Sequence, residues 1–194
     1  MDISISREKK IMIRYLKEDT SGGSPIKIFL TNVGKYAEGE LVGTWVNLPV
    51  DDNFESAKKE IGINGQYEEW FITDYEAPFE IGEYDDIYEL NELAETVQNM
   101  DENEQEVLDC LSRENGYDAK EAIEIIENGD YTIYQDCVDM GEVAFQYLNE
   151  IGMIDELPEW AQDYFDYDQY GVSLETGGAF YYSKKLMGYI EVYH

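Results

Sequence analysis

Carboxylates are the side chains of this sequence that are numerous enough to do chemistry. The 194 residues include 44 Asp and Glu against 13 Lys and Arg. Two carboxylates held at a fixed distance can act as general acid and base in a glycosidase, which needs no histidine. With 44 acids such pairs arise by chance, and no single pair stands out. The same groups can instead form a charged surface that binds a cationic partner.

The sequence contains few residues that could support other kinds of catalysis or metal binding. The only histidine is His194, which argues against most nucleophilic triads and against zinc or iron sites. Cys110 and Cys137 stand alone, and this favours reduced structural thiols over a disulfide. The glycine-rich stretch 34–43 lacks the Lys-Ser/Thr pair of a phosphate loop, so its glycines indicate turns. We therefore predict no catalytic residue, no cofactor and no metal site.

The charge is unevenly distributed along the sequence. The net charge is −31; residues 1–27 carry +2, so the remaining residues carry −31 − 2 = −33. There are 17 acids from Glu60 to Ser112 and 15 from Glu121 to Ser183, and neither stretch contains a base. This pattern argues against an ordinary solvated surface of mixed sign. It also argues against nucleic-acid binding, which needs a basic footprint, and against binding to an anionic membrane.

The sequence indicates neither a membrane span nor an export signal. No stretch reaches the roughly 18 consecutive apolar residues of a span, and the N-terminus lacks a long apolar region with a cleavage site. We expect a cytoplasmic protein without membrane contact. Because 43% of the residues are hydrophobic and 14% are aromatic, the chain can fold despite its charge.

The first third of the sequence predicts a small unit of strands and one helix. A flexible joint at 20–25 follows a basic leader. A loop is expected at 34–40, and a short helix over 51–62 ends at a glycine. Segments of strand character are 26–33, 41–50 and 67–76.

The apolar period changes to that of a helix after Asp85. The buried stripe is expected at Ile87, Leu90, Ala94 and Val97, with acids on the opposite face. The same pattern predicts helices over 101–113 and 119–127. Because these helices are short and closely spaced, a small helical bundle is expected.

The last third predicts a second mixture of strands and helices. An aromatic cluster at 164–170 is expected to pack in the core or in a dimer contact, because the acids between its rings repel phosphate. The three tryptophans, Trp45, Trp70 and Trp160, are expected as core anchors. The predicted strands are 131–136, 179–183 and 187–193, and the predicted helices are 138–152 and 159–171.

These segments predict an α+β fold of three small domains. A basic leader and Ser/Gly linker (1–25) precede an N-terminal domain with a three-stranded antiparallel sheet and a helix (26–84). A central bundle of short helices (85–129) and a C-terminal α+β domain (130–194) follow.

The spacing of the acids approaches the charge density of DNA. Carboxylates at i and i+4 on a helix lie about 6 Å apart along the axis, and those at i and i+2 on a strand about 6.6 Å. Duplex DNA carries one charge per roughly 1.7 Å of axis. A charge of −33 therefore corresponds at most to 33 × 1.7, or about 56 Å, of duplex. A surface that imitates DNA in the basic channel of a DNA-processing enzyme is physically feasible.

The order of the residues also resembles a known family. Segments 27–51 and 67–95 are similar to the opening of ArdA antirestriction proteins, in which a strand leads into an NxGKYxEGxLxGxW motif. Segments 133–152 and 158–171 resemble the C-terminal third of the family, including a DYxxYG ending. The resemblance covers roughly 26–194. The residues that match the first motif are Asn32, Gly34, Lys35, Tyr36, Glu38, Gly39, Leu41, Gly43 and Trp45.

This resemblance implies a fold, an assembly and a function. It implies an elongated, curved arrangement of the three domains and a homodimer formed through the C-terminal domain. It implies a protein that is not an enzyme and that inhibits type I restriction–modification enzymes by imitating bent B-form DNA in their DNA-binding groove. Residues 85–95 are similar to the segment that carries the antirestriction motif of the family, whereas the leader 1–24 departs from its pattern.

The candidate contacts with the partner are acids of the base-free stretches, together with Asp118 just before the second stretch. Two other classes of function stay open: an acidic chaperone or inhibitor of another basic DNA-binding protein, such as a CRISPR effector or a histone-like protein, and a carboxylate-based glycosidase. The candidate contacts are Glu68, Glu69, Asp74, Glu76, Glu80, Glu83, Asp85, Asp86, Glu89, Glu92, Glu95, Asp118, Glu121, Glu124 and Glu127.

Overall fold

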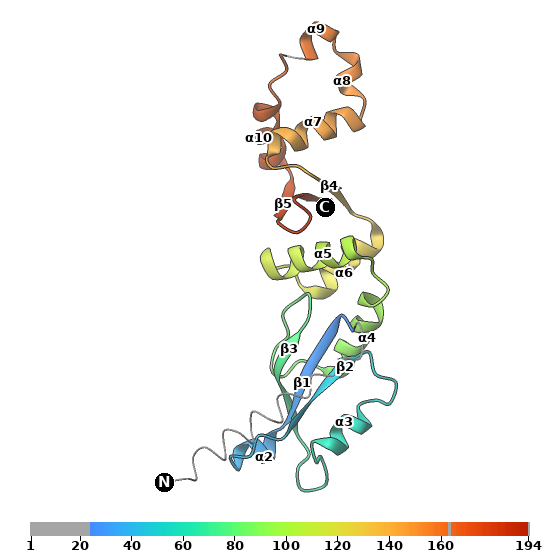
Figure 1. The fold of residues 1–194 in the computed structure, drawn as a ribbon, viewed down its shortest axis with the longest axis vertical. Helices are drawn as coiled ribbons and strands as arrows, with labels where there is room; N and C mark the ends of the chain where they lie inside the picture. Colours follow the sequence, from blue (N-terminus) through green and yellow to red (C-terminus); the bar gives the residue numbers. More distant parts are fainter. Residues whose placement is uncertain (1–23, 163, 194) are drawn as a thin grey trace. The chain divides into compact units, whose positions relative to one another are not determined.

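The fold combines two antiparallel sheets with short helices, as the sequence predicts. A computed structural model describes residues 24–162 and 164–193 (Figure 1). The predicted leader therefore lies outside the described residues, apart from the end of its linker. Two compact units divide the chain: one runs to Ala77 and again from Ile81 to Asn99, and the other contains Pro78–Glu80 and the chain from Met100 onward. The elongated three-domain arrangement stays a prediction.

The first unit is built on a sheet with the strand order β2-β1-β3. The central strand β1 (Ile26–Asn32) pairs antiparallel with both β2 (Gly43–Leu48) and β3 (Trp70–Glu76). The last five residues of β1 are all buried, which suits an apolar strand covered on both faces. Because β1 occupies the centre, β3 is an edge strand of this sheet.

The glycine-rich motif forms a turn of helix rather than the loop expected at 34–40. A short helix, α2 (Val33–Ala37), begins because the buried Asn32 caps it, accepting a hydrogen bond from the Lys35 amide at 2.9 Å. Gly39 has a positive φ of 82°, which favours glycine. A Cβ on Gly43 would lie 2.5 Å from the Phe29 ring. Gly39 serves a turn, as predicted, whereas Gly43 allows close packing in β2, which the sequence did not predict.

Two helices complete the first unit. The predicted helix over 51–62 is present as α3 (Glu55–Glu60), and α4 (Ile87–Val97) forms where the helical period begins. The side chain of Asp86 caps α4 by accepting from the Tyr88 amide at 2.8 Å. The predicted apolar stripe of α4 is the buried one, and both helices contact β2.

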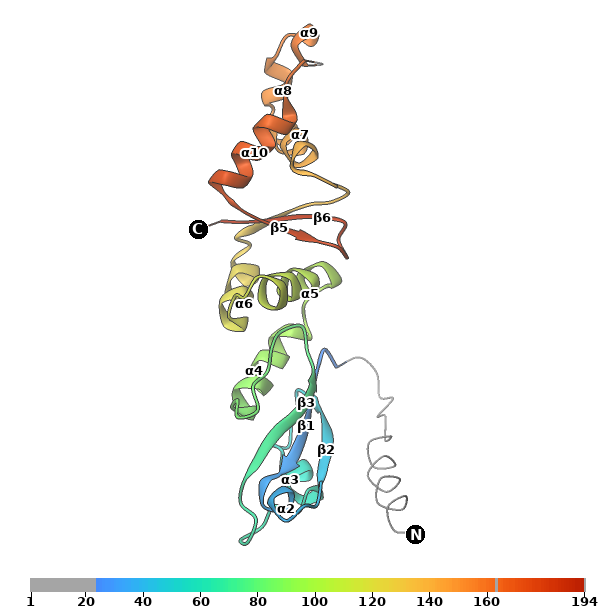
Figure 2. The ribbon, with the colours of Figure 1, turned by 90° about the vertical axis from the view of Figure 1, so that its left-hand side faces the viewer.

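The second unit begins with a pair of short helices. The predicted helix over 101–113 is α5 (Glu102–Asp109), which continues as a π-helical turn, η1 (Cys110–Glu114). The next helix is α6 (Ala119–Asn128), which lies beside α5 (Figure 2). Aspartates cap both helices, and this N-terminal position favours a short carboxylate side chain.

The rest of the second unit is a sheet with two packed helices. The order β4-β6-β5 joins β4 (Tyr131–Tyr134), β5 (Ala179–Ser183) and β6 (Gly188–Val192) in antiparallel pairs. Helix α7 (Met140–Glu150) packs closely against α10 (Tyr167–Gly177). They approach at Gly171, where a Cβ would lie 2.2 Å from the Met140 carbonyl oxygen. The final glycine of the DYxxYG motif thus has a packing role.

The predicted helix over 159–171 is wrong. The chain forms two short helices, α8 (Met153–Glu156) and α9 (Glu159–Gln162), and then starts α10 anew. The restart occurs because the Asp166 side chain accepts from the Gln169 amide at 2.9 Å and caps a new helix. Trp160 is 73% exposed, so its assignment as a core anchor is also wrong.

The aromatic cluster near the start of α10 is partly buried. Phe165 contacts the rings of Tyr167 and Tyr170, and Tyr170 stacks on Tyr147 of α7. Tyr164, in contrast, is 84% exposed. Phe165, Tyr167 and Tyr170 are therefore half-buried and pack against one another and α7, whereas both a place in the core and a dimer contact stay predictions.

Candidate partner-binding surface

Every one of the fifteen candidate acids has an exposed side chain. Two acids precede β3 and two lie on it, four occupy the segment between β3 and α4, and three lie on α4. The other four are the cap and the outer face of α6. Glu80 and the α6 group belong to the second unit, and the remaining ten belong to the first. Their exposure is the geometry that a charged binding surface requires, and their role stays a prediction.

The acids of α6 form a row because the helix buries its other side. Ala122, Ile123 and Ile126 are buried. Glu121, Glu124 and Glu127 are exposed, and their spacing of three residues places them about 4.5 Å apart along the axis. The row has no ion pair with a lysine or arginine among the described residues. Helix α6 therefore presents uncompensated negative charge along one side.

Several candidate acids also support the local fold. Asp86 and Asp118 cap α4 and α6, and Asp118 accepts from the Lys120 amide at 2.9 Å. Asp85 closes the turn before α4 by accepting from the Gly82 amide at 2.7 Å. Glu76 pairs with Lys27 across β1 and β3 at 2.9 Å. Part of the acid surplus is therefore used for capping and pairing, and these carboxylates still face solvent.

One acid of the base-free stretch is buried, which sequence reasoning missed. Glu106 is 6% exposed; its Oε1 accepts from the Ser183 hydroxyl at 2.6 Å, and its Oε2 lies 2.8 Å from the Lys185 ammonium. Hydrogen bonding to Glu106 raises the pKa of Lys185. This carboxylate joins α5 to the end of β5. The residues near Glu106 in the sequence do not indicate this role, because its partner Lys185 lies 79 residues further along the chain.

The cysteines are free and buried, as predicted. Burial raises the pKa of the Cys110 thiol to about 12, and nearby Glu114 adds to the shift. A thiol with this pKa stays protonated at neutral pH and is a poor nucleophile.

Within residues 24–162 and 164–193, no helix is long and apolar enough to cross a bilayer, and no group of three or more His, Cys, Asp or Glu is arranged to hold a metal ion.

A model of the ArdA antirestriction proteins matches residues 28–190. The chain belongs to the ArdA family. The match spans both sheets, so it covers the fold described above and not one motif alone. Among curated proteins, no relative is found. As an ArdA protein, the chain is an antirestriction protein.

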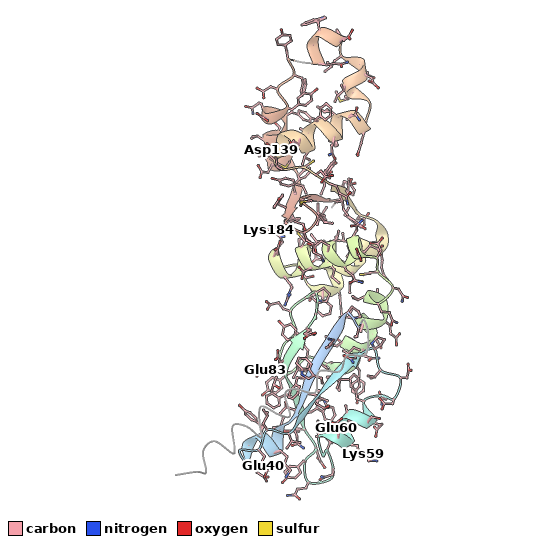
Figure 3. The ribbon with its side chains drawn as sticks, viewed as in Figure 1. Glu40, Lys59, Glu60, Glu83, Asp139 and Lys184 are labelled. Atoms are coloured by element: carbon pink, nitrogen blue, oxygen red, sulfur yellow. The ribbon has the colours of Figure 1, made fainter. Side chains whose placement is uncertain are left out.

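In this ArdA protein, a groove lies beside the edge strand β3. It has a volume of about 540 Å³ and is lined by residues 68–72 and 83–88 together with Val33. Backbone hydrogen bonds fix its walls: the Ile72 amide donates to the Glu83 carbonyl at 2.8 Å, and the Val33 amide donates to the Glu69 carbonyl at 3.1 Å. Figure 3 labels Glu83, which lies beside β3. Five candidate acids and four aromatic residues line the groove.

Proposed function

We propose that this ArdA protein inhibits type I restriction–modification enzymes by occupying their DNA-binding groove as a mimic of bent B-form DNA. The proposal concerns mechanism and partner; family membership supports the coarser antirestriction role. The observation that carries it is the exposure of all fifteen candidate acids in a chain with a net charge of −31. A charge of this size exceeds the magnitude of about 2–8 that solubility needs.

Electrostatics explains how such a surface competes with DNA. A DNA-binding groove holds lysines and arginines that attract phosphates, and its affinity for DNA includes the release of counterions. Exposed carboxylates at near-phosphate spacing attract the same bases and release counterions in the same way. Because the interaction is summed over many acids, single neutralisations are expected to have small effects, and block reversals large ones.

The test is inhibition of a purified type I enzyme. Titrating the protein should abolish both DNA cleavage and methylation, because both activities need bound DNA. A matched control is the same protein with the α6 row and the three α4 glutamates reversed to lysine, which should inhibit neither activity. If wild-type protein at saturation left both activities intact, the proposed target would be wrong.

The same preparation separates the alternative functions. Tighter binding to histones or to a CRISPR effector than to the restriction enzyme would favour an inhibitor or chaperone of other basic proteins. Turnover of an oligosaccharide, abolished by one Glu→Gln change, would favour a glycosidase. We expect neither result.

We also propose that the second unit carries a homodimer contact. Its described surface holds several large exposed apolar side chains, which often mark interaction sites. Sedimentation velocity should give twice the mass of one chain, and Trp160→Glu should lower it. A monomer at micromolar concentration would contradict the proposal. These exposed side chains include Val138, Phe145, Ile151, Met153, Trp160 and Tyr164.

A further inference from the structure

The groove beside β3 differs chemically from a plain acidic surface. Trp70, Phe71, Tyr84 and Tyr88 line it together with five carboxylates. A phosphate mimic needs only negative charge, and large rings at solvent-facing positions add nothing to it. The combination of ring faces and carboxylates in a concave site is instead suited to a cation that is partly desolvated.

Two rings of the groove already bind a cation of the chain itself. The Lys58 ammonium lies 4.9 Å from the centre of the Trp70 ring and 5.1 Å from that of Tyr88. It also donates to the Tyr88 hydroxyl at 2.6 Å. Lys58 comes from α3 and does not line the groove. The Trp70 ring therefore already contacts a cation, and the Tyr88 hydroxyl binds the same ammonium. These two rings are occupied by Lys58.

The other two rings offer an open platform. Tyr84 stacks on Phe71, with ring centres 6.2 Å apart and an angle of 21° between the planes. Tyr84 is nevertheless 80% exposed, so most of its surface is free to contact a ligand. It stands between Glu83 and Asp85 in the sequence, and both of these acids line the groove. The groove therefore contains an exposed aromatic ring together with both of these acids.

The carboxylates of the groove keep their charge available. Among the described residues, Glu68, Glu69 and Glu83 form no ion pair with a lysine or arginine. Asp85 and Asp86 accept one backbone hydrogen bond each, which leaves further acceptor positions on each carboxylate. The site is thus rich in acceptors and poor in donors.

We infer that this groove binds an arginine side chain presented by the target protein. A guanidinium is planar, stacks on aromatic faces and forms two parallel hydrogen bonds to a carboxylate, so it can use both the Tyr84 platform and the flanking acids. A lysine ammonium is more strongly hydrated and lacks this planar geometry. The inference rests on the proposed function for the identity of the target, and it adds a shape-specific contact to a surface otherwise recognised by charge.

A small probe tests the groove without any target enzyme. In a ¹H–¹⁵N NMR titration, N-acetyl-arginine-amide should shift the signals of groove residues in a saturable way at millimolar concentration. The neutral isostere N-acetyl-citrulline-amide should not shift them. Shifts spread evenly over all exposed acids, or equal shifts from both probes, would overturn the inference even if the protein inhibits restriction.

Matched variants connect the groove to the target. Tyr84→Ala should weaken binding to the restriction enzyme about tenfold, or about 1.4 kcal/mol, with little change in salt dependence because no charge is removed. Tyr84→Phe, which keeps the ring, should retain wild-type affinity. Tyr193→Ala is the control, because Tyr193 is also exposed, at 46%, and lies outside both the groove and the set of side chains named for the dimer contact. Equal losses in the Tyr84→Ala and Tyr193→Ala variants, or tighter binding by Tyr84→Ala, would contradict a specific arginine site.

If no type I enzyme binds the protein at all, the proposed function fails, and the NMR titration still decides whether the groove selects a guanidinium. If the enzyme binds but the probe does not, the groove inference alone fails. The two results are therefore separable.

Discussion

Neutralising the α6 row is expected to weaken binding to the restriction enzyme by about tenfold at 100 mM salt. The variant is E121Q/E124Q/E127Q. From Glu121 to Glu127 the row spans six residue steps, or about 9 Å, a length in which one DNA strand places two to three phosphates at about 3.4 Å each. Exposed ion pairs contribute about 0.5 kcal/mol each, so three of them give about 1.5 kcal/mol, or roughly tenfold.

The salt dependence gives a second, sharper magnitude for the same variant. If each carboxylate acts like a phosphate, three losses should reduce the slope of log affinity against log salt by about 2 to 2.7. The advantage of the wild type should then be about 40- to 65-fold at 50 mM salt and about 1.5- to 2.5-fold at 200 mM, on the same scaling. Fluorescence anisotropy of the labelled protein, titrated with enzyme at three salt concentrations, measures both quantities.

A control with the same net charge separates location from total charge. E150Q/E156Q/E175Q removes three exposed acids outside the fifteen candidates. Its affinity for the enzyme should stay within about twofold of that of the wild type, because these acids are not predicted contacts and exposed charges contribute little. Equal losses in the two triple variants would refute the reasoning, because binding would then depend on net charge and not on the α6 row. Circular dichroism should show unchanged helix content in both.

The remaining predictions concern stability and are measured by urea or thermal unfolding. Asp118→Ala should lower the free energy of unfolding by about 1 kcal/mol through loss of the α6 cap, whereas Asp118→Asn should keep it, because asparagine caps equally well; equal losses would show that the charge matters more than the cap. Gly171→Ala should cost about 1–3 kcal/mol or more, because its methyl group would collide with the Met140 backbone; an unchanged midpoint would contradict that close approach. Burial raises the pKa of Asp109 despite the opposing effect of Arg113, so ionised Asp109 destabilises the folded state above its folded pKa. Asp109→Asn should therefore stabilise the protein at pH 7, and the gain should fade as the pH falls through the raised pKa toward about 3.9, the unfolded value; a gain that persisted at pH 3 would have another cause. Raising salt from 20 to 500 mM should raise the melting temperature by screening self-repulsion; no change would indicate that the acids do not repel one another appreciably.

Apolar periodicity predicted much of the fold because it reports directly which face of an element is buried. The stripe that begins at Ile87 is the buried face of α4, and the three strands expected in the first third form one sheet. The same reasoning located the exposed acids of α4 and α6, since a residue opposite a buried stripe faces solvent. The candidates before β3 and between β3 and α4 are also exposed, but periodicity did not place them.

The failures came from local capping and from long-range partners. The predicted helix over 159–171 is interrupted because Asp166 caps a new helix, and an aspartate between aromatic residues gives no clear stop signal. Trp160 is expected as a core anchor, yet it lies on the surface. Buried Glu106 depends on Lys185, which periodicity cannot connect to α5. The groove beside β3 could not be predicted from the sequence, because its lining residues 68–72, 83–88 and Val33 come together only in the folded chain.

Competition with DNA for a type I restriction enzyme tests the central claim most directly. With labelled duplex bound to the enzyme at low salt, added protein should displace all of the DNA, and the displacing concentration should rise steeply with salt. The charge-reversed control should displace none. A ternary complex of enzyme, DNA and protein, with unchanged affinity for DNA, would contradict DNA mimicry.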